Sequence, residues 1–600
     1  MIVLGVHDAI DSGASIVKDG KIMAAVGEER VIRSKLAYGF PREAINTVMK
    51  IAGVKPEDID IVAVAKKNNL LVNEIVPFKG WVETKNTFFR SVFLSTASTL
   101  SPLMKKLGFI EKLYYMARSP LYMHRRRNIR RMMSEEFGIT CPVEFVDHHL
   151  AHASSTYYSS GFDDATVITL DGGGDGLSSS VYAVRNGKFQ KLNQNGSLNS
   201  IGNFYSYVTY ICGFTTHKHE GKITGLAAYG EPKYVEQLRS MIVLEDGKIT
   251  NLSRLFGTSA IAHLLGLLPK DFSKADLAAS IQVYLEEVTV KYVDHWMEKT
   301  GISNLALAGG VFANVKVNQR LHEIPGVDKM FIHPAMGDDG IAVGAAYVMS
   351  HADMISQGGG GKPLACIEDV YFGPEYSDDV LKKALENAEL EYVVHEDVEV
   401  EIARLLSEGY VVARFDGRME YGSRALGNRS ILYQPTDRDV NDWLNKNLVR
   451  TEFMPFAPST LAEHADDCFK NINGAFDPAR FMTITFDCTD WMNRQCPGVV
   501  HIDGTARPQL VRKADNPSYY KIIEEFYKLT GYPCVINTSF NMHEEPIVCT
   551  PEDAIRAFQL GNLDYLAMGD YLIQNPNPLT HDLLPVIRNE HLMEMTSVPV

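Results

Sequence analysis

The run His-His-Leu-Ala-His at positions 148–152 is the sharpest chemical feature of the 600-residue chain. His148 and His152 are four residues apart, so on a helix they lie on one face and can hold one ion together. Asp171 begins a loop after the next expected strand, and Asp338 begins a similar loop in the other half. The spacing therefore predicts a site built from two imidazoles and two carboxylates.

Two imidazoles and one or two carboxylates around an open position suit iron or another divalent metal that binds substrate oxygens. We expect His148, His152, Asp171 and Asp338 to be the metal ligands, with Fe²⁺ as the ion. The alternative is that the histidines only form hydrogen bonds in the core. A spaced pair with two loop-borne aspartates favours the metal. His149 lies on another part of the helix and is left out of the set.

Arginine and glycine are concentrated in a second group of candidate binding residues. The run 418–430 holds three arginines within twelve residues, among glycines and an asparagine. The planar guanidinium group suits bidentate recognition of phosphate, so this pattern predicts a phosphate cradle. The arginines concerned are Arg418, Arg424, Arg429, Arg450 and Arg507.

Polar side chains also follow the apolar strand expected at 534–536. Asn537, Ser539 and Asn541 lie within five residues of one another. The alternative to a binding role is an Asx or Ser/Thr turn. Because binding sites collect at the ends of strands, we expect these three residues to contact a ligand.

A weak internal repeat organises the first half of the chain. Expected strands at 2–6, 14–18 and 21–26 form the first copy, and strands at 165–170, 179–184 and from 188 form the second. Asp-Gly and Asn-Gly turns join the last two strands of each copy, and both pairs favour tight hairpins. This duplicated α/β pattern resembles the actin, Hsp70 and sugar-kinase (ASKHA) superfold, which implies two related halves that close over ATP.

Glycines at the ends of these strands predict where a nucleotide would lie. Gly172 and Gly173 follow Asp171, and Gly309, Gly310 and Asn314 follow an expected strand at 305–308. Glycine lets backbone N–H groups approach phosphate oxygens, and a helix that starts after a strand attracts anions. We therefore expect these residues to bind ATP, whose phosphates could carry Mg²⁺.

Four consecutive glycines at 358–361 mark the best linker candidate. We expect an actin-like domain over 1–357, with an insertion at about 66–133, and a second α/β domain over 375–600, whose last residues could pack back on the first. The insertion carries a basic cluster at 125–131. A solvated helical face is the favoured interpretation of this cluster, and an anion-binding surface is the alternative.

Composition restricts the classes of partner. The net charge of −15 argues against general nucleic-acid binding, which needs a basic footprint. The eight cysteines include no Cys-x-x-Cys pair, so reduced thiols are expected rather than a zinc ribbon. The N-terminus lacks the pattern of a signal peptide, and the most apolar stretch, 88–103, carries Arg90. We therefore expect a cytoplasmic protein without a membrane span, and a homodimer stays open.

These motifs together resemble the NodU/CmcH/TobZ-type O-carbamoyltransferases of antibiotic and nodulation-factor biosynthesis, nearly from end to end. The matching segments are 28–30, 40–41, 148–152, 220–227, 309–311, 418–430, 455–459, 501–507, 537–541 and 545–548. The chain departs from the usual pattern at Ile10, Leu448 and Glu544. Members usually have glycine at the last of these positions.

The resemblance implies a YrdC-like second domain that makes carbamoyl-AMP from ATP and carbamoyl phosphate. It implies that the first domain, similar to the tRNA-threonylcarbamoylation ATPase, transfers the carbamoyl group to a small-molecule hydroxyl. His148, His152, Asp171 and Asp338 would then be both metal ligands and catalytic groups. Arg418 and Arg507 would be catalytic in the second domain. The implied cofactor-binding set comprises Gly172, Gly173, Lys222, Gly309, Gly310, Asn314, Arg424, Arg450, Asn537, Ser539 and Asn541.

Two other classes of function remain. An actin-like ATPase or sugar kinase would release ADP rather than AMP, and it would leave the second domain unexplained. An ATP-gated binding protein of the Hsp70 kind would need neither the metal ligands nor the arginine-rich loop. Formation of AMP that depends on carbamoyl phosphate would exclude both.

Overall fold

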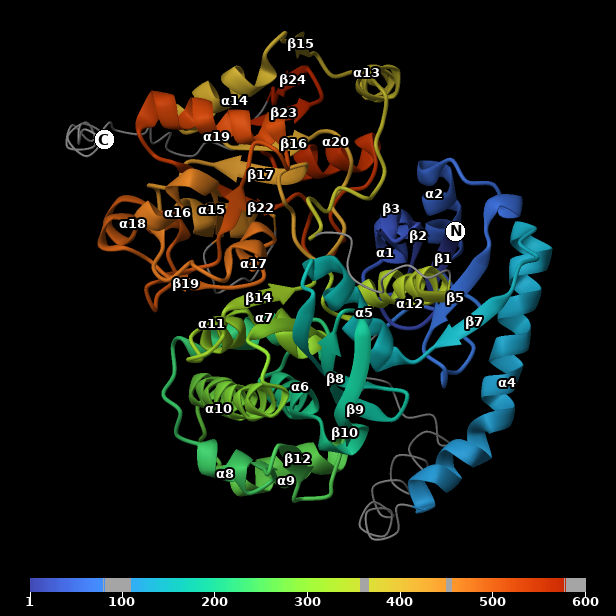
Figure 1. Cartoon of the computed structure of the whole chain (residues 1–600). Coiled ribbons are helices and arrows are strands. Elements are labelled where there is room, and N and C mark those ends of the chain that lie inside the picture. Colours follow the sequence, from blue (N-terminus) through green and yellow to red (C-terminus); the bar gives the residue numbers. More distant parts are fainter. Residues whose placement is uncertain (79, 81–108, 357–365, 449–455, 577, 579–600) are drawn as a thin grey trace. The chain divides into compact units, whose positions relative to one another are not determined.

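Two five-stranded sheets with the same strand order form the framework of the N-terminal half (Figure 1). The first sheet has the order β3-β2-β1-β5-β7, and the second has the order β10-β9-β8-β13-β14. In each sheet three antiparallel strands continue into two parallel ones. The strands are β1 (Ile2–His7), β2 (Gly13–Lys18), β3 (Lys21–Gly27), β5 (Ile61–Ala65), β7 (Val143–Val146), β8 (Asp164–Gly174), β9 (Leu177–Arg185), β10 (Lys188–Gly196), β13 (Asn304–Ala308) and β14 (Lys329–Ile332). The duplication expected of an actin/Hsp70-like (ASKHA) fold is confirmed.

The hairpin turns explain why the two copies fold alike. Asp19 and Gly20 both have positive φ, 50° and 78°, and Asn186 and Gly187 have φ of 49° and 78°. Two successive residues with positive φ match the right-handed twist of the flanking strands, and Asp, Asn and Gly tolerate that conformation best. The same local chemistry therefore closes the outer hairpin of each sheet.

Two helices form the layer between the sheets (Figure 1). Helix α12 (Ile341–Ser356) packs on β1, β2 and β5, and helix α5 (His148–Ser160) packs on β8 and β13. The helices cross closely, because a Cβ atom on Gly344 would lie 1.9 Å from the carbonyl oxygen of Ala151. Only glycine allows this approach. The crossing places the first residues of α5 beside the loop that precedes α12.

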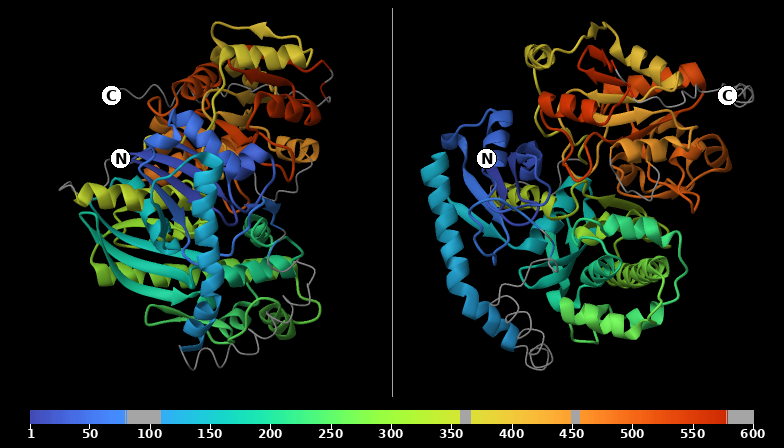
Figure 2. Two further views of the ribbon diagram at one scale, coloured as in Figure 1. Left: turned by 90° about the vertical axis from the view of Figure 1, so that its right-hand side faces the viewer. Right: turned by 180° about the vertical axis from the view of Figure 1, so that it is seen from behind.

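Other helices cover the outer faces of these sheets. Helix α2 (Arg42–Ala52) packs on β2 and β3. The long helix α4 (Phe109–Phe137) runs along the side of β7 (Figures 1 and 2). Helix α10 (Lys274–Thr300) packs with α6 (Ile201–Ile211), α7 (Glu220–Ala227) and α11 (Val315–His322) near the second sheet.

The basic cluster on α4 is not only a solvated face. Arg125 is fully buried, and its guanidinium group pairs with Asp8. Arg126 donates to the carbonyl oxygen of Lys67, and Arg130 donates to that of Val143. The expectation of a solvated face is therefore wrong for Arg125, whose guanidinium group meets a buried carboxylate, whereas Arg127, Arg130 and Arg131 are exposed as expected.

The structure, a computed structural model, describes residues 1–78, 80, 109–356, 366–448, 456–576 and 578. It divides into two units. The first comprises Met1–Glu29 and Leu36–Ile367, and the second comprises Arg30–Lys35 and Glu368–Val600. Several expected features lie outside the described residues. They are the glycine linker at 358–361, Arg450, the residues after 578, and residues 79 and 81–108 of the expected insertion.

Six residues near the N-terminus thus belong to the second unit. Arg30 donates to the carbonyl oxygen of Gly422 at 2.8 Å. Arg33 donates to the carbonyl oxygens of Pro546 and Ile547 at 2.8 and 2.6 Å, and it pairs with Asp553. The segment is therefore tied to the arginine-rich loop and to the 545–548 segment.

The second unit is built on a mixed eight-stranded sheet with the order β15-β24-β23-β16-β17-β22-β18-β21. Helices α14 and α19 pack on each other and on its central strands, and helices α13 and α20 pack together, with α20 on β16 and β23. The strands are β15 (Val393–Val394), β16 (Val412–Phe415), β17 (Arg429–Tyr433), β18 (Ala457–Leu461), β21 (Gln509–Val511), β22 (Cys534–Ser539), β23 (Tyr565–Met568) and β24 (Tyr571–Gln574). The helices are α13 (Asp378–Asn387), α14 (Val398–Ser407), α19 (Pro517–Thr530) and α20 (Pro551–Leu560). The α/β class expected of a YrdC-like domain is confirmed.

One local expectation is corrected. The segment after Leu170 is not a loop from Asp171 to Gly176, because β8 continues through Gly174 and only Asp175 and Gly176 form the turn. A register shift between Leu170 and Gly174 bends the strand there. Within the described residues, no helix is both long and apolar enough to cross a membrane.

Candidate metal centre and arginine-rich loop

Four side chains from three elements converge in the first unit. His148 and His152 extend from the first turns of α5, Asp171 lies in β8, and Asp338 begins the short turn before α12. Nε2 of His148 lies 3.2 Å from Oδ2 of Asp171 and 3.6 Å from Oδ1 of Asp338. Nε2 of His152 lies 3.3 Å from the same Asp338 oxygen. One nitrogen or oxygen atom of each residue lies within 4.8 Å of the other three.

This donor set fits a divalent metal. Nε2 of His152 and Oδ1 of Asp338 are buried, face each other and have no hydrogen-bond partner. Buried polar atoms are normally paired, and a cation bound between these two atoms would pair both of them. Two imidazole nitrogens and two carboxylate oxygens suit iron and similar transition metals. The four residues could therefore hold one ion.

The local electrostatics keep these side chains in the protonation states that bind a metal. Burial lowers the pKa of His152, which keeps its imidazole neutral. Burial would raise the pKa of Asp338, but Lys66 and the nearby histidines outweigh it, so this pKa lies well below its usual range. Neutral imidazole and ionised carboxylate are the forms that bind metal.

The backbone around Asp171 is shaped to carry its carboxylate. Oδ1 accepts a hydrogen bond from the backbone N–H of Gly310 at 3.1 Å, and Oδ2 accepts one from that of Gly173 at 3.3 Å. Gly174 passes so close to His148 that a Cβ atom there would lie 2.2 Å from the imidazole ring. The expected phosphate-binding glycines Gly173 and Gly310 thus also orient Asp171, and Gly172 accepts from Asn203.

The remaining expected nucleotide-binding residues of this unit lie near α7 and α11. Lys222 in α7 is buried, with Nζ 6.0 Å from the ring centre of Phe214. Asn314 caps α11 by accepting from the backbone N–H of Val317, and its amide donates to Gln282. Gly309 precedes the turn Gly310–Ala313. Lys222 and Asn314 are therefore held by the fold, and a nucleotide role for them remains a proposal.

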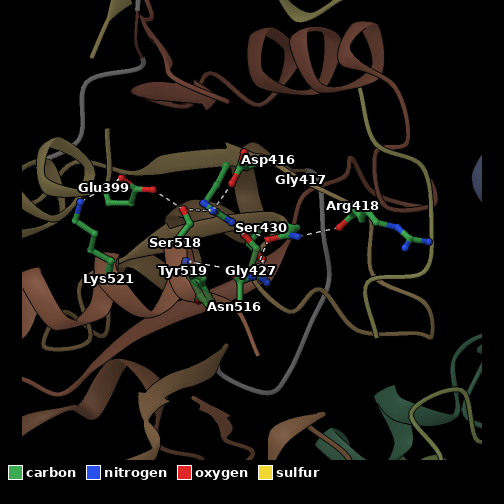
Figure 3. Close-up of polar contacts among 12 residues, drawn as sticks. Glu399, Asp416, Gly417, Arg418, Gly427, Ser430, Asn516, Ser518, Tyr519 and Lys521 are labelled. Atoms are coloured by element: carbon green, nitrogen blue, oxygen red, sulfur yellow. Dashed lines mark hydrogen bonds and ion pairs between the residues drawn. The ribbon is translucent and has the colours of Figure 1, made fainter. Parts of the chain in front are cut away.

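In the second unit, the loop 416–430 is organised around buried groups (Figure 3). Arg414 donates to the carbonyl oxygen of Gly427, to Asn428 and to Ser518, and it pairs with Asp416. The amide of Asn428 donates to the carbonyl oxygen of Arg418. These contacts hold both ends of the loop against β16.

Glu420 holds the middle of the same loop. Its Oε1 accepts hydrogen bonds from the backbone N–H groups of Leu426, Asn428 and Arg429, at 2.8, 2.8 and 3.1 Å. The side chain is 3% exposed. These three N–H groups bind the chain's own carboxylate, so they are not open to a phosphate.

The arginines of this unit fall into two groups. Arg429 is fully buried, stacks on Phe415 and donates to the carbonyl oxygens of Asp416 and Gly417, so it braces the loop. Arg418 is only half-buried, and its guanidinium group extends away from the network of Figure 3 to the carbonyl oxygen of Phe372. Arg424 and Arg507 are likewise half-buried. Arg418, Arg424 and Arg507 stay candidates for phosphate binding.

The polar segment after β22 supports the same loop. The amide of Asn537 donates to the carbonyl oxygen of Ala425, to Ser459 and to Gln509. Asn541 donates to the carbonyl oxygens of Met542 and Glu545, which closes a turn. Ser539 ends β22. Asn537 and Asn541 therefore stabilise the loop and the turn through these hydrogen bonds, and their contact with a ligand stays a prediction.

Sequence reasoning missed several residues that build these sites. Lys66 and His7 both lie against Asp338, with Lys66 Nζ 2.7 Å and His7 Nε2 3.7 Å from its Oδ2. Burial, with the charge of Lys66, lowers the pKa of His7 to about 3. Arg414 was detectable as a charge inside an apolar strand, since a buried charge needs a partner. Nothing local marked Lys66.

Comparison with known proteins places this geometry in a family. The family described as "Carbamoyltransferase N-terminus" matches residues 2–347, and "Carbamoyltransferase C-terminus" matches residues 403–575. An uncharacterised protein of Synechocystis sp. is 32% identical over 604 residues, which cover 94% of this chain and 95% of that protein. Nodulation protein NolNO of Sinorhizobium fredii is 32% identical over 94% of this chain and 79% of its own length.

Among solved structures, component A of the (R)-2-hydroxyglutaryl-CoA dehydratase of Acidaminococcus fermentans matches with a TM-score of 0.32 and 18% identity. It covers 58% of this chain and 96% of its own. This match adds nothing to what the strand order already carries. Because both family halves follow each other along the chain and a relative aligns over nearly its whole length, the chain belongs to the carbamoyltransferase family.

Proposed function

We propose that the chain is an O-carbamoyltransferase that uses ATP and carbamoyl phosphate. In this proposal the second unit makes carbamoyl-AMP. The first unit transfers the carbamoyl group to a hydroxyl of a small natural product or sugar. Family membership supports carbamoyl transfer, and the two sites described above support a division of the chemistry between the units.

The activation step joins carbamate to AMP. Water cleaves carbamoyl phosphate into carbamate and phosphate, and a carbamate oxygen then attacks the α-phosphorus of ATP and displaces pyrophosphate. We expect Arg418, Arg424 and Arg507 to neutralise the phosphate oxygens, because planar guanidinium groups pair well with them. Glu420 and Arg429 hold the loop that presents these groups.

The transfer step breaks the bond between the carbamoyl carbon and the AMP oxygen. The acceptor hydroxyl attacks that carbon, AMP leaves, and the hydroxyl proton is released. A carbamoyl carbon is a poor electrophile because its nitrogen donates electrons into it, so a good leaving group is required. His148, His152, Asp171 and Asp338 would hold a divalent metal, which would polarise the carbamoyl oxygen.

Keeping both steps on one chain has a chemical reason. Carbamoyl-AMP is labile in water, and a chain that carries both sites raises its effective concentration at the second one. The observation that carries the proposal is the convergence of four metal-binding side chains in a chain that matches both halves of the carbamoyltransferase family.

The test incubates the purified chain with ATP, carbamoyl phosphate and Fe²⁺ but no acceptor, and follows the nucleotides by mass spectrometry. AMP, pyrophosphate and carbamoyl-AMP should appear only when both substrates are present. Release of ADP alone would instead support an ATPase or kinase. Absence of any turnover would contradict the proposal.

Two variants separate the half-reactions. Asp338→Asn should still form carbamoyl-AMP but lose transfer to an added hydroxyl acceptor. Arg418→Met should lose carbamoyl-AMP formation yet still transfer from carbamoyl-AMP supplied in solution. Arg494→Met, at an exposed arginine whose Nε donates to the carbonyl oxygen of Asp490 in its own helix, is the control. Equal loss of both steps in both variants would contradict the division of labour.

A further inference from the structure

Lys66 lies directly after β5 and reaches the metal centre from the opposite sheet. Its Nζ donates to Oδ2 of Asp338 at 2.7 Å, and the two side chains are 12% and 16% exposed. The other oxygen of Asp338, Oδ1, is the buried atom without a hydrogen-bond partner that faces His148 and His152. One oxygen of Asp338 therefore pairs with Lys66, whereas the other faces the two histidines.

The backbone of Lys66 is held in a strained conformation. Its φ is 67°, in the left-handed region that non-glycine residues adopt only at a cost. Arg125 donates to its carbonyl oxygen at 2.9 Å and to that of Ala65 at 3.3 Å. Such strain persists where the surroundings over-determine the conformation, and it collects at functional sites.

The loop is gripped from its other side by Asp175. This carboxylate accepts from the backbone N–H groups of Lys67 and Asn68, at 2.9 and 2.6 Å. It also accepts from the backbone N–H of His148, the first residue of α5, at 2.9 Å. One side chain thus fixes the loop that carries Lys66 and the helix that carries the histidines. The position of Lys66 relative to the metal ligands is therefore built into the fold.

We propose that Lys66 is a positioning residue that holds one oxygen of Asp338, so that only the other oxygen can bind the metal. The positive charge of Lys66 also makes the metal-loaded site net positive. With neutral imidazoles, two carboxylates balance a divalent ion, and the ammonium group adds the excess charge. A net positive site prefers an anionic ligand, which here means a phosphate ester or anhydride. The inference rests on the metal site of the proposed function and assigns this site a ligand charge.

Cobalt provides a readout that needs no turnover. Co²⁺ bound to the wild-type chain should give visible absorption bands, and inorganic phosphate or AMP should shift them. In Lys66→Met, Asp338 is released and can bind through both oxygens, so the bands should weaken as the coordination number rises. The concentration of phosphate needed to shift them should rise at least about tenfold, since a nearby positive charge is lost.

Lys66→Gln separates positioning from charge. Its amide can still donate to Asp338, so the cobalt bands should resemble those of the wild type, while the response to phosphate should be lost. If Lys66→Met fails to fold, Lys66→Gln still tests the inference. Lys67→Met is the matched control, because Lys67 is exposed and lies in the same loop. It should behave as the wild type in both measurements.

The outcomes are distinct. Unchanged bands and an unchanged phosphate response in Lys66→Met, or a full phosphate response in Lys66→Gln, would overturn the inference even if carbamoyl-AMP is made. Absence of carbamoyl-AMP together with the expected cobalt changes would instead overturn the proposed function alone. A wild-type chain that binds no cobalt would overturn the inference and the metal centre, and the formation of carbamoyl-AMP would then still decide the activation step of the proposed function.

Discussion

Nε of Arg125 donates to Oδ2 of Asp8 at 2.8 Å, although both side chains are completely buried and 117 residues separate them. The pair joins α4 to the end of β1, one residue after His7. Arg125 also holds the end of β5 through the carbonyl oxygens of Ala65 and Lys66. This helix, which belongs to the insertion expected at 66–133, thus braces the ends of β1 and β5, where His7 and Lys66 lie against Asp338.

Removing one partner of this pair should be costly. Arg125→Met leaves the charge of Asp8 buried and unpaired, so we expect a loss of about 3–5 kcal/mol in the free energy of unfolding of the first unit. The double variant Asp8→Leu/Arg125→Met should lose less than the two single variants together, because no isolated charge remains. Urea unfolding measures both. Arg131→Met, at an exposed arginine, is the control. A loss below about 1 kcal/mol in Arg125→Met would show that Asp8 does not remain as a buried, unpaired charge.

The metal centre can be tested by metal content. His152→Ala and Asp338→Asn each remove one ligand atom, so we expect Fe²⁺ affinity to fall by at least roughly 100-fold. Elemental analysis after dialysis should find metal in the wild type and little in either variant. A chelator should lower the melting temperature of the wild type, because bound metal stabilises the folded state, and should leave the variants unchanged. His351→Gln, at a buried histidine outside the centre, should retain metal. Equal metal content in all four chains would exclude the site.

The convergence of His148 and His152 could be predicted because helix periodicity is local, and their spacing alone places them on one face. The two aspartates do not lie in different halves, because Asp171 in β8 and Asp338 after β14 both lie toward the carboxyl ends of strands of the second sheet. Lys66 could not be predicted, because its partner lies 272 residues away and a lysine pair in a loop resembles any exposed pair.

The arginines also show what could not be predicted from the sequence. Five basic residues at 125–131 resemble a solvated helix face, yet Arg125 is fully buried because Asp8 and two carbonyl oxygens meet it. The run 418–430 was predicted to bind phosphate through its arginines, and the structure adds that the backbone N–H groups of Leu426 and Asn428 bind Glu420 and that Arg429 braces the loop. Composition indicates that a segment is unusual, whereas the partner of each charge is decided by tertiary contacts.

Glu420 should be essential to the stability of its loop. Glu420→Ala leaves three buried backbone N–H groups without an acceptor, and each costs about 1–3 kcal/mol, so we expect the second unit to lose at least about 3 kcal/mol. Glu420→Gln keeps one acceptor oxygen and should lose less. Glu408→Gln, at an exposed carboxylate of the same unit, should have almost no effect. Thermal unfolding of the three variants gives the order. A Glu420→Ala chain as stable as Glu408→Gln would contradict the anchoring role.

Glu544, a position where the resemblance implies glycine, has a φ of 63°, in the left-handed region. A side chain in this conformation clashes with the backbone, whereas glycine adopts it freely. Glu544→Gly should therefore stabilise the second unit by about 0.5–1 kcal/mol, after the greater flexibility of glycine in the unfolded chain is counted. Glu544→Ala keeps the Cβ atom and should not be stabilising. If both variants gain equally, loss of the carboxylate rather than relief of strain is the cause.

Stability at acid pH should depend on His351. This residue is 1% exposed, stacks on Tyr158 with ring centres 3.6 Å apart, and donates from Nδ1 to the carbonyl oxygen of Tyr347. Burial lowers its pKa from 6.5 to about 4. Its neighbours Tyr158 and Tyr347 have raised pKa values, so they stay neutral over this range.

Between pH 6.5 and pH 4 the unfolded chain binds a proton at His351 that the folded chain does not. The free energy of unfolding therefore falls as the pH falls through this window, by up to about 3 kcal/mol from this residue. His351→Gln is neutral at every pH, so its deficit relative to the wild type at pH 6.5 should shrink by about that amount at pH 4. Urea unfolding of both chains across the window measures the difference. A deficit that is constant with pH would mean that His351 is protonated equally in the folded and unfolded chains.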